Sequence, residues 1–254
     1  AATRLRTHAE VLLRVNPATA PQAGLAMTGV ESQFGFEEEL LAQQAADIKA
    51  LTDRINLIGV HVYFGTQIAV NTLVTTTRMA LETAERVAKL LGFTCRVVDC
   101  GGGFPWPYAS AEAGSELSPL AAEYAALLAE SAFARSVELW FESGRYLAAA
   151  SGTLLATVLD VKESKGGKKY VVLDTGIHHL GGMSGLGRIP RPYIGITRLR
   201  DGASGELETV DIVGPLCSPL DSLGRNLKLP PLQPGEVIAI PNVGAYGLTA
   251  SLLG

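Results

Sequence analysis

The first half of the chain alternates between two hydrophobic periods. Short apolar runs, typical of buried strands, alternate with longer segments in which apolar residues recur every three or four positions, typical of amphipathic helices. The apolar runs predict strands over 10–15, 57–64, 94–99 and 137–142. The periodic segments predict helices over 36–55, 71–91 and 118–134, with Gly92 and the pair Ser118-Pro119 as helix-end signals. Strands that alternate with helices of this length favour βαβ units and a parallel sheet.

The pattern changes near residue 151. Short β-type runs, separated by Gly, Pro and Asp turns, predict strands over 153–161, 169–174, 209–213 and 236–240. The basic run KESKGGKK, over 162–169, is interpreted as the turn of a hairpin. The sequence therefore predicts an α/β domain over residues 1–150 and an all-β domain over residues 151–254.

Composition narrows the classes of function. Of the 254 residues, 47% are hydrophobic and 18% are charged, and the formal net charge is −4, as expected for a globular protein. No stretch concentrates Lys or Arg, which argues against a nucleic-acid partner. The longest weakly polar run, 146–159, is too short to span a membrane. Three cysteines without ligand spacing argue against a disulfide framework and indicate a reduced, cytoplasmic setting. The pair His178-His179 lacks acidic or cysteine companions, so no metal site is predicted.

Polar residues and glycines follow the predicted strands at their carboxyl ends, where active sites lie in α/β barrels and open α/β sheets. Gly101, Gly102 and Gly103 come shortly after the strand over 94–99. Because these residues have no Cβ atoms, their N–H groups can approach an anion closely. The same residues also suit a tight structural turn, so a phosphate site and a plain turn both remain open.

Two further strand ends carry titratable side chains. Glu142 and Arg145 lie at the end of the strand over 137–142, where they form either an ion pair in a loop or a site for a cationic ring nitrogen and an anion. His61 and Tyr63 share one face of the strand over 57–64. A histidine at such a position is either a packed core residue or a functional group, and both interpretations remain open.

Eight short motifs occur in order along the chain. They are RVNP (14–17), SQFG (32–35), GVHVYFGTQ (59–67), DCGGGFP (99–105), ESGRY (142–146), LDTGIHH (173–179), GPLCSPLD (214–221) and GAYG (244–247). Together they resemble the fold-type III pyridoxal-phosphate decarboxylases, the ornithine, diaminopimelate and arginine decarboxylase group, and most closely a branch associated with exopolysaccharide and secondary-metabolite gene systems. The resemblance implies a partial (β/α)8 barrel of the alanine-racemase type, lacking its first strands, and a C-terminal all-β domain. It also implies pyridoxal 5'-phosphate as cofactor and a homodimer with shared active sites.

The resemblance assigns roles to residues of these motifs. The implied cofactor-binding residues are Tyr63, Thr66, Gly101, Gly102, Gly103, Glu142, Gly144, Arg145 and Tyr246. Glu142 would keep the pyridine nitrogen protonated, so that the ring stabilises the carbanion left at Cα by decarboxylation. Cys217 would deliver the proton that completes the product, and Asp221 would line the substrate end, both in the site of the partner subunit.

The sequence departs from the family pattern at three points. No lysine precedes Arg14, so the Schiff-base lysine of the family is missing and the 254 residues alone are expected to be inactive. Ser218 stands where many relatives place an acid that contacts a substrate ammonium, and Tyr63 stands in place of a ring-stacking histidine. We expect Arg188 or Arg191 to select a substrate with a distal carboxylate.

The leading interpretation is an enzyme, a pyridoxal-phosphate-dependent decarboxylase of an amino acid or an amino-acid-derived substrate, represented by an N-terminally truncated piece. Two alternatives remain open. One is a non-catalytic homologue that binds a partner protein, and the other is an amino-acid racemase on the same barrel. Racemases of this type tend to hold the pyridine nitrogen unprotonated with an arginine, whereas the candidate here is Glu142.

Overall fold

The computed structural model describes residues 2–5, 7–17, 33–51, 53–180, 197–198 and 206–251. The chain divides into two compact units. The first unit comprises residues 1–105 and 115–143, and the second comprises residues 106–114 and 144–254. Each unit has its own hydrophobic core, so each is described by itself. The domain boundary near residue 150 stays a prediction.

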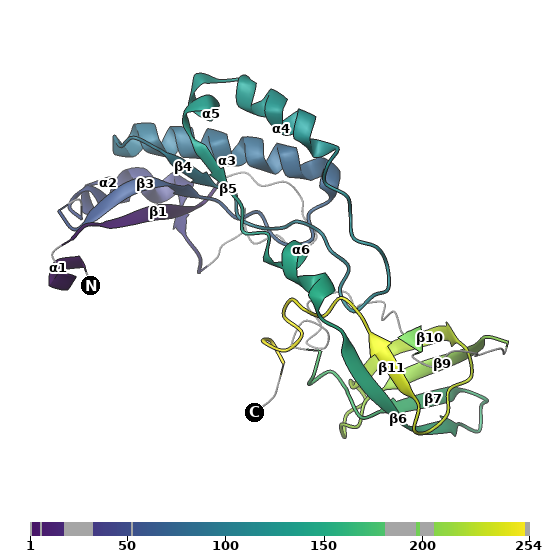
Figure 1. The fold of residues 1–254 in the computed structure, drawn as a ribbon. Helices are drawn as coiled ribbons and strands as arrows, with labels where there is room; N and C mark the ends of the chain where they lie inside the picture. Colours follow the sequence, from purple (N-terminus) through teal and green to yellow (C-terminus); the bar gives the residue numbers. More distant parts are fainter. Residues whose placement is uncertain are drawn as a thin grey trace. The chain divides into compact units, whose positions relative to one another are not determined.

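The first unit is built on a parallel sheet of five strands in the order β2-β1-β3-β4-β5 (Figure 1). The strands are β1 (Ala9–Asn16), β2 (Phe36–Glu37), β3 (Ile55–His61), β4 (Val97–Asp99) and β5 (Glu138–Trp140). All four pairings between neighbouring strands are parallel. The parallel sheet predicted from the alternation of strands and helices is therefore confirmed.

The described residues of the first unit also form helices. They are α1 (Ala2–Leu5), α2 (Leu41–Lys49), α3 (Val70–Leu91), α4 (Leu120–Ala129) and α5 (Ala132–Ser136). The long helix α3 packs against β3 and β4, and α4 packs against α3 (Figure 1). The buried face of α3 includes Ala80, Ala84 and Val87, which pack with residues of the strands in the core. The helix ends at Gly92, whose φ of 72° is left-handed, as the glycine at that position predicted.

The helix predicted over 36–55 is wrong at both ends. Residues Phe36–Glu37 pair with β1 as a strand, and the 3-10 turn η1 (Glu38–Leu40) precedes α2. Both oxygens of the Glu37 carboxylate accept the side-chain N–H₂ of Asn16, at 2.8 and 2.9 Å, which fixes this edge. At the other end, the N–H of Arg54 donates to the carbonyl of Leu51, and this turn leads into β3. Pairing with β1 thus outweighs the helical spacing of apolar residues at the start of this segment.

The helix predicted over 118–134 is two helices. Helix α4 ends at Ala129, and the side chain of Ser131 caps α5 by accepting the N–H of Ala134 at 2.9 Å. Ser118, predicted as a cap, instead donates its hydroxyl to the carboxylate of Glu116. Ser131, a residue type favoured at helix N-caps, therefore lies between the two helices and starts the second.

The second unit begins with the short helix α6 (Gly144–Ala148) and the 3-10 turn η2 (Ala149–Ser151). Its sheet has the order β10-β9-β7-β6-β11-β8. The strands are β6 (Leu154–Glu163), β7 (Lys169–Leu173), β8 (Thr197–Arg198), β9 (Glu208–Val213), β10 (Ser222–Leu229) and β11 (Val237–Ile240). All pairs are antiparallel except β7 with β9, which is parallel.

The predicted hairpin in the second unit is confirmed. Strands β6 and β7 pair in antiparallel fashion, and the N–H of Ser164 donates to the carbonyl of Lys168 across the turn at 2.9 Å. Strand β10 was not predicted, because its sequence is irregular. Its register against β9 shifts twice, and Asn226 has a φ of 53°. Such a bulged strand lacks the clean alternation that marks strands in a sequence.

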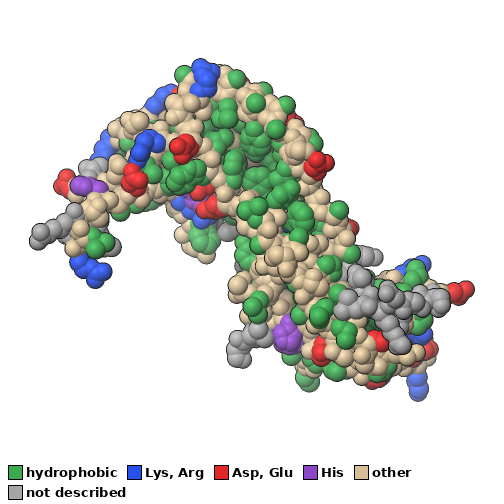
Figure 2. Space-filling model, in the orientation of Figure 1, with side chains coloured by type: hydrophobic (Ala, Val, Ile, Leu, Met, Phe, Trp, Pro, Cys, Tyr) green, Lys and Arg blue, Asp and Glu red, His purple; other side chains and the backbone are tan. Residues whose placement is uncertain are grey.

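Hydrophobic side chains also reach the surface of the first unit (Figure 2). Its exposed large hydrophobic residues are Leu5, Phe34, Phe36, Leu40, Leu51, Leu90, Trp140 and Phe141. Among the described residues, no helix has both the length and the apolar character needed to cross a membrane.

Candidate active site

Three neighbouring parallel strands of the first unit bring His61, Asp99 and Glu142 together at their carboxyl ends. His61 is the last residue of β3 and lies opposite Asp99, the last residue of β4. Asp99 in turn lies opposite Trp140 at the end of β5, and Glu142 follows two residues later. The N–H of Glu142 donates to the carbonyl of Gly101 at 2.9 Å, which continues the pairing of the two strands into their loops. Register alone therefore gathers these side chains.

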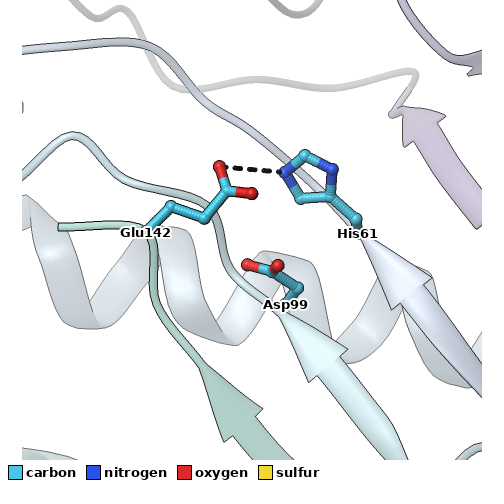
Figure 3. Close-up of side chains that lie close together, drawn as sticks. All are labelled: His61, Asp99 and Glu142. Carbon is cyan, nitrogen blue, oxygen red and sulfur yellow. Dashed lines mark ion pairs between the residues drawn. The ribbon is translucent and has the colours of Figure 1, made fainter. Parts of the chain in front are cut away.

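The three side chains point toward one another (Figure 3). The His61 Nε2 atom lies 3.8 Å from Glu142 Oε2, and one ligand atom of each of the three residues lies within 4.8 Å of the others. Asp99 is buried and accepts the N–H of Gly101 at 2.9 Å. The side chain of Glu142 is 56% exposed, against 14% for His61. The cluster thus presents one accessible carboxylate supported by two largely buried groups, and such a donor set suits a protonated ring nitrogen or a divalent cation.

The triple glycine next to this cluster makes a close backbone cradle. A Cβ atom on Gly102 would lie 2.6 Å from the carbonyl oxygen of Glu142, and one on Gly101 would lie 2.8 Å from the ring of Tyr63. Gly101 also has a φ of 67°, which disfavours any side chain. Among the described residues, the N–H groups of Gly102 and Gly103 have no hydrogen-bond partner. Two adjacent donors therefore remain free for an anion.

Tyr63 and Thr66 border the same cradle. The Tyr63 ring packs on Gly101, and the Arg14 guanidinium of β1 lies 5.7 Å from the centre of that ring. Thr66 is half-buried, and the carbonyl of its neighbour Gly65 lies where a Cβ atom on Gly103 would come within 2.8 Å. Tyr63, the three glycines and the Glu142 backbone thus lie together within the first unit, with Thr66 next along the chain from Gly65.

The other predicted cofactor residues belong to the second unit. Arg145 on α6 is buried, and its Nε atom has no hydrogen-bond partner in the described part of the chain. Its guanidinium carbon lies 5.1 Å from the ring centre of Tyr246 and 5.9 Å from that of Tyr108. Burial raises the pKa of Tyr108, while the charge of Arg145 acts in the opposite direction. Gly144 is exposed at the start of α6.

The loop between β9 and β10 carries Cys217 and Asp221. Cys217 is exposed. Asp221 is buried, and its two oxygens accept the N–H groups of Ile177 and Leu216, each at 2.8 Å. The Asp221 carboxylate therefore holds this loop against the chain after β7, which presents Cys217 at the surface. Ser218 accepts the N–H of Leu220 at 3.2 Å and offers no negative charge.

Two of the predicted site residues have no described position, and two residues of the cluster were not predicted. Arg188 and Arg191 lie outside the described residues. Sequence reasoning left His61 undecided and gave Asp99 no role, although both stand at strand ends in the chain. The predicted strand over 57–64 placed His61 inside the strand, whereas β3 ends at His61, and only the strand register shows that the side chains meet.

Comparison with protein families agrees with this geometry. Residues 2–149 match the model described as "Pyridoxal-dependent decarboxylase, pyridoxal binding domain", and residues 145–244 match "Pyridoxal-dependent decarboxylase, C-terminal sheet domain". The chain belongs to the pyridoxal-dependent decarboxylase family. The fold class predicted from the sequence, a partial barrel of alanine-racemase type and a β domain, is confirmed.

Individual relatives are decarboxylases of amino acids or their derivatives. The chain is 33% identical over 252 residues to the L-glutamyl-[BtrI acyl-carrier protein] decarboxylase of Niallia circulans, with 96% of this chain and 58% of that protein covered. It is 30% identical over 248 residues to the diaminopimelate decarboxylase of Archaeoglobus fulgidus, with 95% and 57% covered. The chain thus spans somewhat over half the length of the curated relatives it matches.

Solved structures support the same fold. Diaminopimelate decarboxylase from Helicobacter pylori complexed with L-lysine superposes with a TM-score of 0.79 at 26% identity, covering 100% of this chain and 60% of that one. The enzyme from M. jannaschi gives a TM-score of 0.80 at 27% identity, with 98% and 57% covered.

The residues of the first unit fit the cofactor of this family, pyridoxal phosphate. The glycine cradle has two free N–H donors and no room for side chains, as a phosphate requires. The Glu142 carboxylate is accessible beside it, as a protonated ring nitrogen requires. In the second unit, the buried Arg145 with an unpartnered nitrogen is a further group suited to an anion.

Proposed function

We propose that these residues form the greater part of a pyridoxal-phosphate-dependent decarboxylase that acts on an amino acid or an amino-acid-derived substrate. The observation that carries the proposal is the place of Glu142. Its backbone contacts the glycine cradle, and its accessible carboxylate lies at the carboxyl ends of three parallel strands, within 4.8 Å of the Asp99 carboxylate that accepts the N–H of Gly101. Active sites of parallel α/β folds lie at this end of the strands.

The cofactor-binding residues are Tyr63, Thr66, Gly101, Gly102, Gly103, Glu142, Gly144, Arg145 and Tyr246. The N–H groups of Gly102 and Gly103, with the Arg145 guanidinium, would hold the phosphate. The Tyr63 ring, which packs on Gly101, would contact the face of the pyridine ring. When bound, pyridoxal phosphate supplies an electron sink for the pair released as the substrate carboxylate leaves as CO₂.

Glu142 would keep a proton on the ring nitrogen. An ionised carboxylate next to a basic nitrogen favours the protonated form of that nitrogen. An arginine at this position would disfavour it, which is why Glu142 supports a decarboxylase over a racemase.

Cys217 would deliver a proton to Cα of the product, in the site of a partner subunit. Its exposure and its place on a loop held by Asp221 support this role, because a proton donor must be accessible and positioned. We propose Asp221 as a residue at the substrate end of the same loop. The enzyme would then be a homodimer with shared active sites.

The substrate would carry a distal carboxylate or another acidic group. Ser218 supplies no negative charge for a second substrate ammonium, and Arg188 or Arg191 would bind the acidic group. Relatives whose names specify a diaminopimelate or a glutamyl substrate support this proposal.

The 254 residues by themselves would not decarboxylate. Their seven lysines are Lys49, Lys89, Lys162, Lys165, Lys168, Lys169 and Lys228. The two in the first unit lie on helices, and none follows a strand of the parallel sheet. Neither lysine of the first unit is therefore placed to form the Schiff base beside the glycine cradle. A cytoplasmic location also stays a prediction.

The test expresses the longest reading frame that contains these residues and measures CO₂ release. The substrates are diaminopimelate, lysine, ornithine, carboxylated amines and a glutamyl group on an acyl-carrier protein. We expect release that depends on pyridoxal phosphate, a preference for a substrate with a distal acidic group, and none from the 254 residues alone. No release from any substrate would overturn the proposed function, and a preference for plain ornithine would overturn the proposed specificity.

A further inference from the structure

We propose that His61 is a positioning residue that holds the Glu142 carboxylate at the ring nitrogen of the cofactor, against repulsion from Asp99. The proposal rests on the function proposed above. It concerns the cluster of Figure 3, in which the side chains of His61, Asp99 and Glu142 meet at the ends of three strands.

Asp99 is the fixed member of this cluster. Its residue is 8% exposed, it ends β4, and its Oδ1 atom accepts the N–H of Gly101 at 2.9 Å. The hydrogen bond to the first glycine of the cradle and the burial of Asp99 restrict the movement of its side chain. The carboxylate of Asp99 therefore lies close to the place that Glu142 must occupy.

Glu142 is the movable member. It follows β5 in a loop, and its side chain is 56% exposed. Two ionised carboxylates within 4.8 Å repel each other, and the repulsion is strong when one of them is buried. Without a compensating group, the exposed Glu142 side chain would turn toward the solvent and away from the cradle.

His61 is the group that opposes this movement. Its Nε2 atom is buried, lies 3.8 Å from Glu142 Oε2, and has no hydrogen-bond partner within the described residues. A buried N–H group without a partner is costly, so a small movement of Glu142 toward His61 is favourable. The neighbouring cation, Arg14 on β1, instead lies over the rings of Phe34 and Tyr63, at 4.9 and 5.7 Å.

The experiment uses the protein expressed from the longest reading frame that contains these residues and measures its complex with pyridoxine 5'-phosphate labelled with ¹⁵N in the ring. This analogue has no aldehyde, so its binding needs no lysine. For each variant, calorimetry gives the dissociation constant, the ¹⁵N chemical shift gives the protonation of the ring nitrogen, and circular dichroism confirms folding. The variants are His61→Phe, Asp99→Asn and the double variant, with His8→Gln as the control on an exposed histidine of the same unit.

We expect His61→Phe to weaken binding about tenfold and to move the ¹⁵N shift toward that of the unprotonated ring. Adding Asp99→Asn should restore most of both, because it removes the repulsion that His61 offsets. The His8→Gln variant should match the unchanged chain.

Three results would overturn the inference while leaving the proposed function standing. They are an unchanged ¹⁵N shift in His61→Phe, a loss that Asp99→Asn does not repair, and binding that a chelator abolishes, which would assign the cluster to a metal ion instead. Failure of the unchanged chain to bind the analogue would overturn the proposed function and this inference together.

Discussion

Each residue of the glycine cradle is constrained by a different neighbour. Gly101 is set by its positive φ and by Tyr63, whereas Gly102 is set by the backbone of Glu142. The backbones of the cradle and of Glu142 are thus in direct contact, and a side chain added to Gly102 must displace the Glu142 loop.

Gly102→Ala tests this contact. The new Cβ atom would lie 2.6 Å from the Glu142 carbonyl oxygen, so the loop must shift, at a cost of roughly 1–3 kcal/mol. We expect weaker binding of pyridoxal phosphate, by about tenfold or more, in an isothermal titration. Gly166→Ala is the matched control, because its nearest neighbour is the Ser164 hydroxyl at 4.0 Å. Equal binding by both variants would show that the cradle does not hold the cofactor.

The three cysteines of the chain differ in their exposure to solvent. Burial, aided by the charge of Asp99, raises the pKa of Cys100 to about 12, and burial also raises the pKa of Cys95. Both thiols therefore stay protonated and unreactive at pH 8, whereas Cys217 is exposed. We expect one rapidly labelled thiol per chain with a disulfide reagent, and none in Cys217→Ser. Rapid labelling of that variant would contradict the packing around Cys95 and Cys100.

Residues whose role follows from local chemistry could be predicted from the sequence. The three glycines, Glu142 and Tyr63 stand in recognisable motifs, and in the structure Gly101 and Gly102 lie next to Tyr63 and the Glu142 backbone. The relation between His61 and Asp99 could not be predicted, because the two residues are 38 positions apart and meet only through the register of β3 and β4.

At the scale of elements, periodicity predicted the long helix α3 and the parallel strands. It overestimated the segment around α2, because Phe36 and Glu37 have a better partner in β1 than in a helix. It also missed β10, whose bulges break the alternation. Helices and strands with a regular hydrophobic period can thus be predicted from the sequence, whereas those whose conformation depends on pairing with another strand cannot.

In the sheet of the second unit, one titratable carboxylate connects the turn before β7 with β9 and β10. The buried Asp211 on β9 accepts the N–H of Asn226 at 2.9 Å and pairs with Lys168 at 2.7 Å. Burial alone would raise the pKa of Asp211, but the hydrogen bonds from Lys168 and Asn226 outweigh it and lower the pKa.

Because the pKa of folded Asp211 lies below its unfolded value of about 3.8, its carboxylate stabilises the unit above that pH. The stabilisation is lost as the pH falls below that value through the folded pKa. We expect Asp211→Ala to lower the free energy of unfolding by roughly 1–3 kcal/mol at pH 7 and by less at pH 3. Urea unfolding at both pH values measures this, with the exposed Asp160→Ala as control. An equal loss at both pH values would contradict the assigned charge.

At the scale of the whole molecule, the residues proposed to bind the cofactor or act on the substrate are distributed over both units. The first holds the glycine cradle and Glu142, and the second holds Arg145, Tyr246 and Cys217. Family membership and fold agree with the sequence prediction, whereas the substrate and the dimer are proposals, since the chain spans only 57–58% of the length of its first curated relatives.

The most direct test of the central claim, that Glu142 and the glycine cradle together hold the cofactor, is calorimetric titration with pyridoxal phosphate of the protein expressed from the longest reading frame that contains these residues. The account predicts saturable binding by the unchanged chain and by Glu123→Gln, an exposed glutamate of α4 in the same unit. It predicts at least about tenfold weaker binding by Glu142→Gln, because a charge-assisted hydrogen bond to the ring nitrogen is lost. Equal affinity of the two glutamine variants would contradict it.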